Sequence, residues 1–340
     1  MQKKLFHTIV IGCKLILGVG LLGVLLFWGD NLEQLMALAS SIGWMDVLVL
    51  CLISLVLNWI SCLKWDLFLK ERGFRISQLR LLGLYYIGKF FSNFVPTTIG
   101  GDLTRTFLLG RQINSQSQSF ASVFLERVTG FAALMIVAVV FAAINPKLLG
   151  EPKITISISL FSMGFLGVVA LVLSQSLVNH LAAMLGHVVF VSALLDKVRK
   201  VQRDILFFKG RPVLLCKAMA YSFTFHLFAC VNVYAACMVI GFYPSFLDIA
   251  VITPIILLLN VLPVSPNNIG WWEWTFSFLL VEAGSGPAEG LAVGLILRFI
   301  TLLSSLAGGV VFLFERDRKG DMAHDQRTTN AAQSDMRKGV

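Results

Sequence analysis

The chain has 340 residues, of which 57% are hydrophobic and only 14% charged, and its mean hydropathy is +0.80. An ordinary soluble domain is about 25% charged. Long apolar runs fill nearly all of the sequence up to residue 315, which leaves no stretch for a separate soluble catalytic domain. The net charge of +9 indicates basic cytoplasmic loops rather than a nucleic-acid partner, because membrane proteins concentrate Lys and Arg in such loops.

Six apolar runs reach the roughly 20 residues that a helix needs to cross a bilayer. They lie near residues 8–28, 44–64, 118–144, 153–174, 213–241 and 288–314. Two further apolar runs, 81–95 and 249–262, are too short to cross, and each leads into a segment rich in Pro and Gly. We therefore predict an all-α, multi-pass membrane protein with two re-entrant helical hairpins, near 82–112 and 249–283.

Basic residues predict the topology, because they mark the cytoplasmic side. Segments rich in Lys and Arg lie at residues 3–4, 64–80, 197–211 and 316–319. The loop after the first span carries Asp30 and Glu33 but no Lys or Arg, so it is predicted to lie outside. These assignments agree only if each short run returns to the side from which it enters. Both termini are then cytoplasmic, and the two hairpins enter from opposite faces.

A pattern that occurs twice, about 170 residues apart, supports this arrangement. The first copy reads Asn93-Phe-Val-Pro96 and then Ile99-Gly100-Gly101-Asp102; the second, four residues longer, reads Asn260-Val-Leu-Pro263 and then Ile269-Gly270-Trp-Trp-Glu273. In each copy an arginine follows the acidic residue by 25 positions, Arg127 in one and Arg298 in the other. Two units, near 44–144 and 213–314, are thus predicted to be inverted repeats, which is a plan typical of transporters.

The broken helices and the two arginines point to an anion. A helix that begins inside the membrane leaves unpaired N–H groups at its start, and these favour negative charge. An arginine at the centre of a span costs roughly 2.5–3.5 kcal/mol on insertion scales, so it normally faces a partner or a polar cavity. Arg127 and Arg298 either hold a phosphate through bidentate bonds, or pair with Asp102 and Glu273 and pin each loop to its span. Both alternatives stay open.

Other polar residues have simpler interpretations. Glu126 lies about 100° around the helix from Arg127 and is expected to face the other unit. Arg105, one turn after Asp102, is expected near the cytoplasmic mouth. His226 is predicted to be a hydrogen-bonded packing residue. The remaining predictions are interfacial anchoring by Trp271, Trp272 and Trp274, and snorkelling to the membrane surface by Lys14 and Lys89.

The first loop, Pro96-Thr-Thr-Ile-Gly-Gly-Asp102-Leu-Thr-Arg105, resembles the transmembrane region of lysylphosphatidylglycerol synthases, a flippase-like family. The resemblance continues through Glu126-Arg127, Pro263-Val-Ser-Pro266-Asn-Asn-Ile-Gly270-Trp-Trp-Glu273 and Arg298, over about residues 10–315. It implies movement of a lipid across the bacterial cytoplasmic membrane. Synthase activity is not expected, because the soluble domain that carries it in bifunctional relatives is absent from this sequence.

The resemblance also implies a headgroup site made of both loops and both arginines. With Asn93 and Asn260 from the repeated pattern and Glu126 beside Arg127, the predicted substrate-binding residues are Asn93, Pro96, Gly100, Gly101, Asp102, Arg105, Glu126, Arg127, Asn260, Pro263, Pro266, Gly270, Glu273 and Arg298. The expected substrate is an anionic phospholipid, an aminoacyl-phospholipid or a polyprenyl phosphate. No cofactor and no metal are expected.

We therefore expect a lipid translocase that works by alternating access, in one transmembrane domain (1–315) followed by a polar cytoplasmic tail (316–340). A separate lipid-modifying enzyme is a conceivable partner, and the oligomeric state stays open. The first alternative is an integral-membrane transferase that uses Asp102 or Glu273 as its base. The second is a non-catalytic scaffold for envelope synthesis. An enzyme would alter the lipid chemically, whereas a scaffold would tolerate alanine at both acids and both arginines.

Overall fold

A computed structural model describes residues 2–27, 31–94, 100–174, 176, 179–180, 210–262 and 264–338, and all regular structure within them is helical, as predicted. The long helices are α1 (Gln2–Phe27), α3 (Trp44–Glu71), α6 (Gln116–Ala143), α8 (Pro152–Leu173), α11 (Pro212–Val239) and α14 (Pro287–Lys338). The shorter ones are α2 (Asn31–Ser41), α4 (Gln78–Phe94), α5 (Gly100–Gln112), α7 (Pro146–Leu149), α12 (Phe246–Leu259) and α13 (Trp271–Leu280), with 3-10 turns at Pro266–Asn268 and Val281–Ala283.

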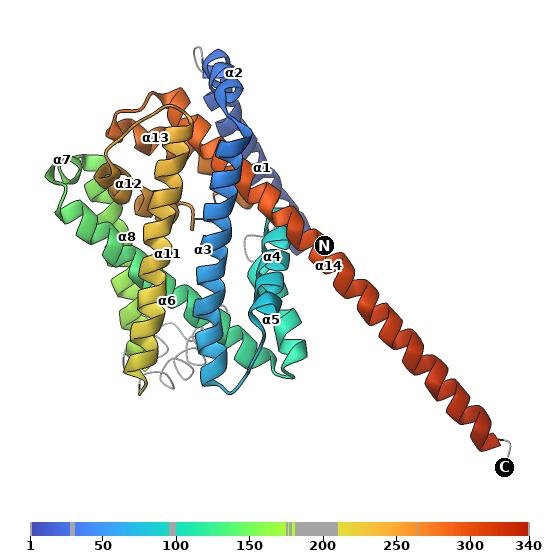
Figure 1. The fold of residues 1–340 in the computed structure, drawn as a ribbon. Coiled ribbons are helices and arrows are strands. Elements are labelled where there is room, and N and C mark those ends of the chain that lie inside the picture. The colour runs from blue at the N-terminus through green and yellow to red at the C-terminus, as the bar shows by residue number, and fades with distance from the viewer. Residues whose placement is uncertain are drawn as a thin grey trace.

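Four helices in the described part of the chain are long and apolar enough to cross a membrane: α3, α6, α11 and the first part of α14, Pro287–Phe314. The predicted spans 8–28 and 153–174 coincide with α1 and α8. The chain is therefore a multi-pass membrane protein. Beyond its apolar part α14 continues to Lys338, so the predicted polar tail is helical up to that residue (Figure 1).

Each short apolar run forms a short helix, α4 or α12, and the next helix along the chain, α5 or α13, packs against it; each such pair is called a hairpin below. In the first hairpin, α4 and α5, Arg80 donates to Gln112 across the open end (Nε to Oε1, 3.0 Å). The two helices approach closely at Gly101, where an added Cβ would lie 2.0 Å from Ser92 Oγ. In the second hairpin, α12 and α13, Asp248 near the start accepts a hydrogen bond from the segment that follows α6 (Asn145 Nδ2 to Oδ1, 2.7 Å).

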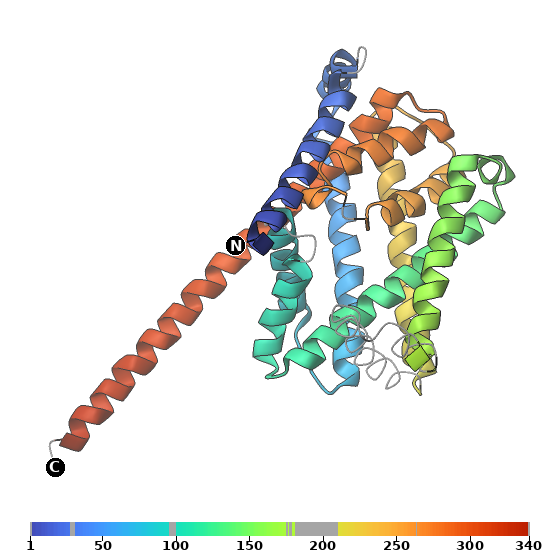
Figure 2. The same ribbon diagram turned by 180° about the vertical axis from the view of Figure 1, so that it is seen from behind.

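The two hairpins lie toward opposite ends of the molecule. In both views α4 and α5 lie toward the lower end, and α12 and α13 toward the upper end (Figures 1 and 2). At the lower end, the last residue of α3, Glu71, forms an ion pair with Arg211, the residue that directly precedes α11. The end of the predicted cytoplasmic segment 197–211 that the structure describes, Arg211, therefore lies beside the segment 64–80.

The two units make equivalent contacts with each other. Helices α3 and α11 pack side by side at the centre (Figure 1). Helix α4 of the first hairpin packs against α14, and helix α12 of the second hairpin packs against α6. One helix of each hairpin thus lies against the last span of the other unit.

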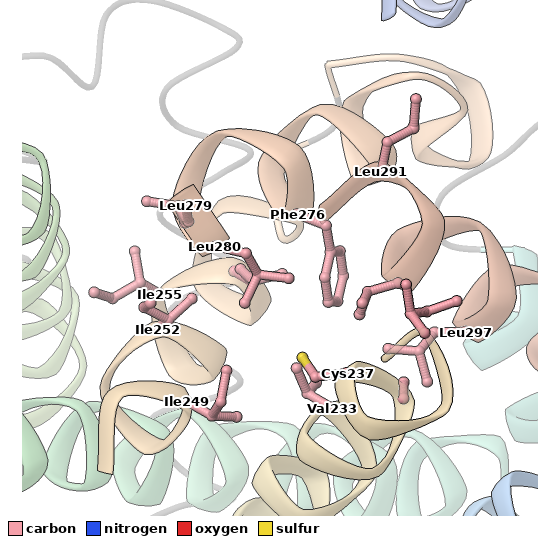
Figure 3. Close-up of a cluster of buried hydrophobic side chains, with 14 of the residues drawn as sticks. Val233, Cys237, Ile249, Ile252, Ile255, Phe276, Leu279, Leu280, Leu291 and Leu297 are labelled. Atoms are coloured by element: carbon pink, nitrogen blue, oxygen red, sulfur yellow. The ribbon is translucent and has the colours of Figure 1, made fainter. Parts of the chain in front are cut away.

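The largest hydrophobic cluster joins α11, α12, α13 and α14, with Phe276 at its centre (Figure 3). Ten of the 14 residues of α12 are buried, in accord with its apolar character on every side. A short helix of this kind is stable at membrane depth only when protein surrounds it. The cluster fixes the second hairpin, and with it the wall of the cavity described below.

Candidate functional site

Asp102, the third residue of α5, lies between two arginines. Arg127 of α6 holds it with two parallel hydrogen bonds, from Nε to Oδ2 (2.9 Å) and from Nη2 to Oδ1 (2.8 Å). Arg105, one turn further along α5, donates from Nε to Oδ1 (3.0 Å). The fork-shaped contact with Arg127 is the stronger type of charge-assisted pairing. Both carboxylate oxygens of Asp102 are therefore occupied.

Arg105 connects this pair to a second, deeper carboxylate. Its side chain is only 2% exposed, and its Nη1 lies 2.8 Å from Glu126 Oε2 as an ion pair rather than as an aligned hydrogen bond. The guanidinium also lies over the rings of Trp65 (4.9 Å) and Tyr85 (4.7 Å), a favourable arrangement for a desolvated cation. The first unit thus holds a row of alternating charges, which runs from the half-exposed Arg127 through Asp102 to the buried Arg105 and Glu126.

Two predictions about these charged residues were wrong. Glu126 was expected to face the other unit, but α5 packs along α6 and covers both position 126 and position 127. Glu126 and Arg127 point about 100° apart around α6, yet both side chains are long enough to contact the same neighbouring helix, α5. Arg105 was expected near a cytoplasmic mouth, but aromatic rings enclose it.

The second unit places an acid and an arginine at the same positions. Glu273 is the third residue of α13, as Asp102 is of α5, and Arg298 is the twelfth residue of α14, as Arg127 is of α6. Arg298 forms an ion pair with Glu273 through Nε. The sequence left open whether the two arginines bind a phosphate or pair with the acids of their own units. In the structure each arginine pairs with its own acid.

The two arginines nevertheless differ in their surroundings. Arg298 also donates to two loop carbonyls, Asn267 O (3.2 Å, from Nη1) and Asn268 O (2.8 Å, from Nη2). Glu273 in turn accepts from the backbone N–H of Gly270 (2.8 Å), which caps α13. The side chain of Arg298 is 17% exposed, whereas that of Arg127 is 51% exposed. Arg298 pins its loop, while Arg127 keeps an open face.

That open face belongs to a cavity of about 440 Å³ between the two units. The first unit contributes its charged and much of its polar lining: Ser54, Asn58, Tyr85, Lys89, Ser92, Asp102, Arg105 and Arg127. The second unit contributes uncharged residues, mainly apolar, with Asn232, Thr253 and Thr301 as polar exceptions. Three cations and one carboxylate lie in this lining. Glu126, behind the lining, pairs with Arg105, so the cluster of three cations and two carboxylates has an excess of one positive charge.

The other predicted site residues shape the loops around the cavity. Asn93 O, at the end of α4, accepts from Asn267 Nδ2 (3.3 Å), so the tips of the two hairpins touch. Asn260 ties the second loop to α13 (Nδ2 to Thr275 Oγ1, 2.9 Å). Gly270 has a positive φ of 77°, and an added Cβ would lie 2.0 Å from Gly18 O of α1.

The remaining predicted site residues lie at helix starts or outside the lining of the cavity. Gly100 and Gly101 begin α5, and Pro266 begins the 3-10 turn of the second loop. Glu126, Glu273 and Arg298 do not line the cavity. Pro96 and Pro263 lie outside the described residues, and so does most of the segment 177–195, which was predicted to lie along the membrane surface.

Several lining residues escaped sequence reasoning. Lys89 was assigned to the membrane surface, but it lines the cavity, as does Trp272, whose Nε1 donates to Gly294 O (2.9 Å). Asn232 and Thr253 also line it; Asn232 Oδ1 is buried without a partner among the described residues, and Thr253 Oγ1 lies beside the Cys230 thiol. A single Asn or Thr in an apolar run gives no pattern to detect. Lys89 lies four positions before the repeated Asn93, and this proximity to the repeated pattern could have predicted its place in the cavity.

Two further polar residues pack the span helices together. Lys64, which the charge pattern placed in a cytoplasmic segment, is buried within α3 and donates to Glu126 O (2.9 Å) and to Ser222 Oγ (3.2 Å) of α11. His226 Nε2 lies 3.0 Å from Gly130 O of α6. His226 is therefore hydrogen-bonded inside the helix packing, as predicted, and it does not line the cavity.

Comparison with known proteins agrees with this architecture. A UPF0104 membrane protein of Pyrococcus horikoshii is 23% identical to the chain over 326 residues, which cover 89% of this chain and 96% of that protein. No solved structure matches the chain. The family model described as the lysylphosphatidylglycerol synthase TM region matches residues 9–309. The chain, with its paired hairpins and its acid–arginine clusters, therefore belongs to the lysylphosphatidylglycerol synthase TM region family.

Proposed function

We propose that this protein is a lipid translocase, which moves a phosphate-bearing lipid across the bacterial cytoplasmic membrane by alternating access. The observation that carries the proposal is the excess of positive charge at the cavity between the units. Arg105 and Arg127 are paired with Asp102 and Glu126, whereas Lys89 lines the same cavity without a carboxylate partner among the described residues. Uncompensated charge at membrane depth is costly. A bound anion removes that cost, and the anion that abounds in a membrane is a lipid phosphate.

The size and walls of the cavity suit a headgroup rather than a whole lipid. A volume of about 440 Å³ is at the lower end of small-molecule pockets, which run from about 300 to 1,000 Å³. Apart from Asn232, Thr253 and Thr301, the wall of the second unit is apolar, with Phe225, Ile256, Phe276 and Ile300 among its members. In our proposal the headgroup enters the cavity while the acyl or prenyl chains stay in the bilayer, so that the protein need not bury them.

The movement itself follows from the repeated architecture. We propose that the hairpins α4–α5 and α12–α13 are re-entrant and that the two units are inverted repeats. The equivalent positions of the acid–arginine pairs and the reciprocal packing of each hairpin on the other unit support this. In inverted-repeat transporters, the two units rock against each other around a fixed central site. The contact between Asn93 and Asn267 places both hairpin tips where such rocking would open and close them.

The proposed orientation has both termini in the cytoplasm. The end of the molecule that carries Lys70, Arg75, Arg211 and Lys217 would face the cytoplasm, in keeping with the positive-inside rule. We propose that the protein transports without chemical change to the lipid, so it is not an enzyme. A separate lipid-modifying enzyme is a proposed source of its substrate.

Purified protein in liposomes tests the proposal. We would place tail-labelled phosphatidylglycerol, its lysyl form or a polyprenyl phosphate in one leaflet at a time and follow loss of asymmetry with a membrane-impermeant, headgroup-specific reagent. The proposal expects at least one of these lipids to redistribute faster than in protein-free liposomes, with an unchanged mass. A lipid of altered mass would instead indicate a transferase. Wild-type rates equal to those of protein-free liposomes, with the protein correctly inserted, would exclude a translocase.

A further inference from the structure

We infer that the contact between α3, α6 and α11 below the cavity is the gate toward the cytoplasmic side, and that Lys64 keeps this gate from locking shut. The inference rests on the proposed alternating access and names its moving part. The contact, called the floor below, has a polar layer and an apolar layer. Its side chains are Lys64, Phe68, Leu125, Leu214, Ala218 and Ser222.

The floor lies between two hollows that share the same pair of helices. Along α3, Lys64 lies between Asn58, which lines the cavity, and Lys70, which lines a second hollow of about 470 Å³ toward the lower end of the molecule. Along α11 the order is the same, with Ser222 between the residues of the two linings. The floor therefore separates the cavity from the hollow at the end that we assign to the cytoplasm.

The polar layer ties the two units together. Lys64 Nζ donates to Glu126 O of α6 (2.9 Å) and to Ser222 Oγ of α11 (3.2 Å). Gly130 of α6 makes room for the ammonium group, since an added Cβ there would lie 3.3 Å from Nζ. The Gly130 carbonyl oxygen also lies 3.0 Å from His226 Nε2 of α11. Two polar contacts, one helical turn apart on α6, thus reach across to the second unit.

The apolar layer lies further from the cavity. It is a small cluster of buried side chains from α3, α6 and α11: Phe68, Leu125, Leu214 and Ala218. Phe68 follows Lys64 by one turn of α3, and Leu214 also lines the lower hollow. On the upper side of the cavity, residues of α3 and α11 belong instead to the much larger cluster of Figure 3. The lower barrier is therefore the thinner one.

Lys64 makes the closed floor less stable than an apolar floor would be. Its side chain is buried, and its ammonium group forms no ion pair with any residue that the structure describes. The Glu126 carboxylate is held by Arg105; at longer range it attracts the ammonium group, which Arg105 and Arg127 repel. Burying a charge without an ionic partner is costly, and water removes that cost when the floor opens. Lys64 therefore brings the closed and open states closer in free energy.

Lys64→Met gives opposite expectations for a gate and for a packing residue. Met is about as long as Lys and carries no charge, so it fills the floor without the cost of desolvation. Glu126 O keeps Thr129 Oγ1 at 3.2 Å, and the Ser222 hydroxyl can turn to a carbonyl of the preceding turn. We therefore expect a higher unfolding temperature in detergent and a floor that opens less. If Lys64 only held the helices together, its loss would lower the unfolding temperature.

The test follows one thiol in the cavity. Ser54→Cys, in protein whose six cysteines are replaced by alanine, places that thiol in the lining. A small, membrane-impermeant thiol reagent is added to inverted membrane vesicles, whose outer face is cytoplasmic. Because the reagent passes the floor only while it is open, the initial rate reports the open fraction. We expect Lys64→Met to slow the reaction about 5-fold or more, the effect of removing an unfavourable buried charge.

Three controls accompany this measurement. Lys147→Met makes the same substitution at an exposed position of α7 and should leave the rate unchanged. In right-side-out vesicles, Lys64→Met should not slow the reaction, because a closed floor does not obstruct the opposite face. Phe68→Ala, which thins the apolar layer, should speed the reaction from the cytoplasmic face; an unchanged rate would place the barrier elsewhere and overturn the inference.

The outcomes separate this inference from the proposed function. A Lys64→Met variant that reacts as fast as the starting protein from the cytoplasmic face, or that unfolds at a lower temperature, would overturn the inference. Equal slowing from both faces would do so too, because it would show a general change at the thiol. A starting protein that never reacts from the cytoplasmic face has no gate there. None of these results bears on lipid movement by the wild type in liposomes, which decides the proposed function by itself.

Discussion

Arg127→Gln is expected to slow lipid movement by about 10- to 100-fold while the protein keeps its fold. This range is the effect of losing one charge-assisted hydrogen bond, which contributes about 1.5–3 kcal/mol. Arg127 lines the cavity with a half-exposed side chain, and Asp102 keeps Arg105 as a partner after the substitution. The measurement is the initial rate of phosphatidylglycerol redistribution in proteoliposomes. Arg111→Gln is the matched control, because Arg111 lies exposed on α5 outside the cavity.

Arg298→Gln is expected to behave differently, although the repeat gives both arginines the same position. Arg298 holds Glu273 and two loop carbonyls, and it does not line the cavity. Its loss should therefore lower the unfolding temperature in detergent more than Arg127→Gln does. A variant Arg127→Gln that moves lipid at the wild-type rate, or that unfolds as readily as Arg298→Gln, would contradict the roles assigned to the pair.

The second large effect is expected at Arg105. Arg105→Met removes the only ion-pair partner that the described residues give Glu126, which is 3% exposed. Breaking one side of a buried ion pair costs about 3–5 kcal/mol, because the other charge stays buried alone. We expect a correspondingly lower midpoint of unfolding by denaturant in detergent. Arg111→Met, on the exposed side of the same helix, should change the midpoint little.

A double variant distinguishes the ion pair from simple packing. Adding Glu126→Gln to Arg105→Met removes the stranded charge, so it should recover a large part of the lost stability. The Met side chain still lies between Trp65 and Tyr85, where an apolar group is well placed. A double variant no more stable than Arg105→Met would show that Arg105 acts through its ring contacts instead.

Much of the architecture follows from the sequence alone. Length and hydropathy located the long helices of the described residues, because a bilayer imposes a minimum apolar length. The short runs 81–95 and 249–262 stood out for the same reason, and they correspond to α4 and α12. The same spacing of 25 residues between acid and arginine occurs in both copies of the repeated pattern. This repetition suggested the pairs Asp102–Arg127 and Glu273–Arg298, which the structure contains.

The sequence could not reveal how the two copies differ. Arg127 and Arg298 occupy equivalent positions, yet only tertiary contacts decide that one faces a cavity and the other a loop. Asn232 and Thr253 gave no periodic signal, since each is a single polar residue in an apolar run. Glu126 was misplaced because a helical wheel gives direction but not the breadth of the neighbouring helix.

Filling the cavity tests the central claim most directly, namely that a lipid headgroup passes through it. The starting protein has its six cysteines replaced by alanine, and Ser54→Cys then places one thiol in the lining of the cavity. We predict that a bulky thiol reagent lowers phosphatidylglycerol redistribution to the rate of protein-free liposomes. The same reagent on Met163→Cys, at a position of α8 that is 71% exposed, should have no effect. Redistribution that continues at full rate with the Ser54→Cys thiol completely modified would contradict the account, because the lipid would then be taking another route.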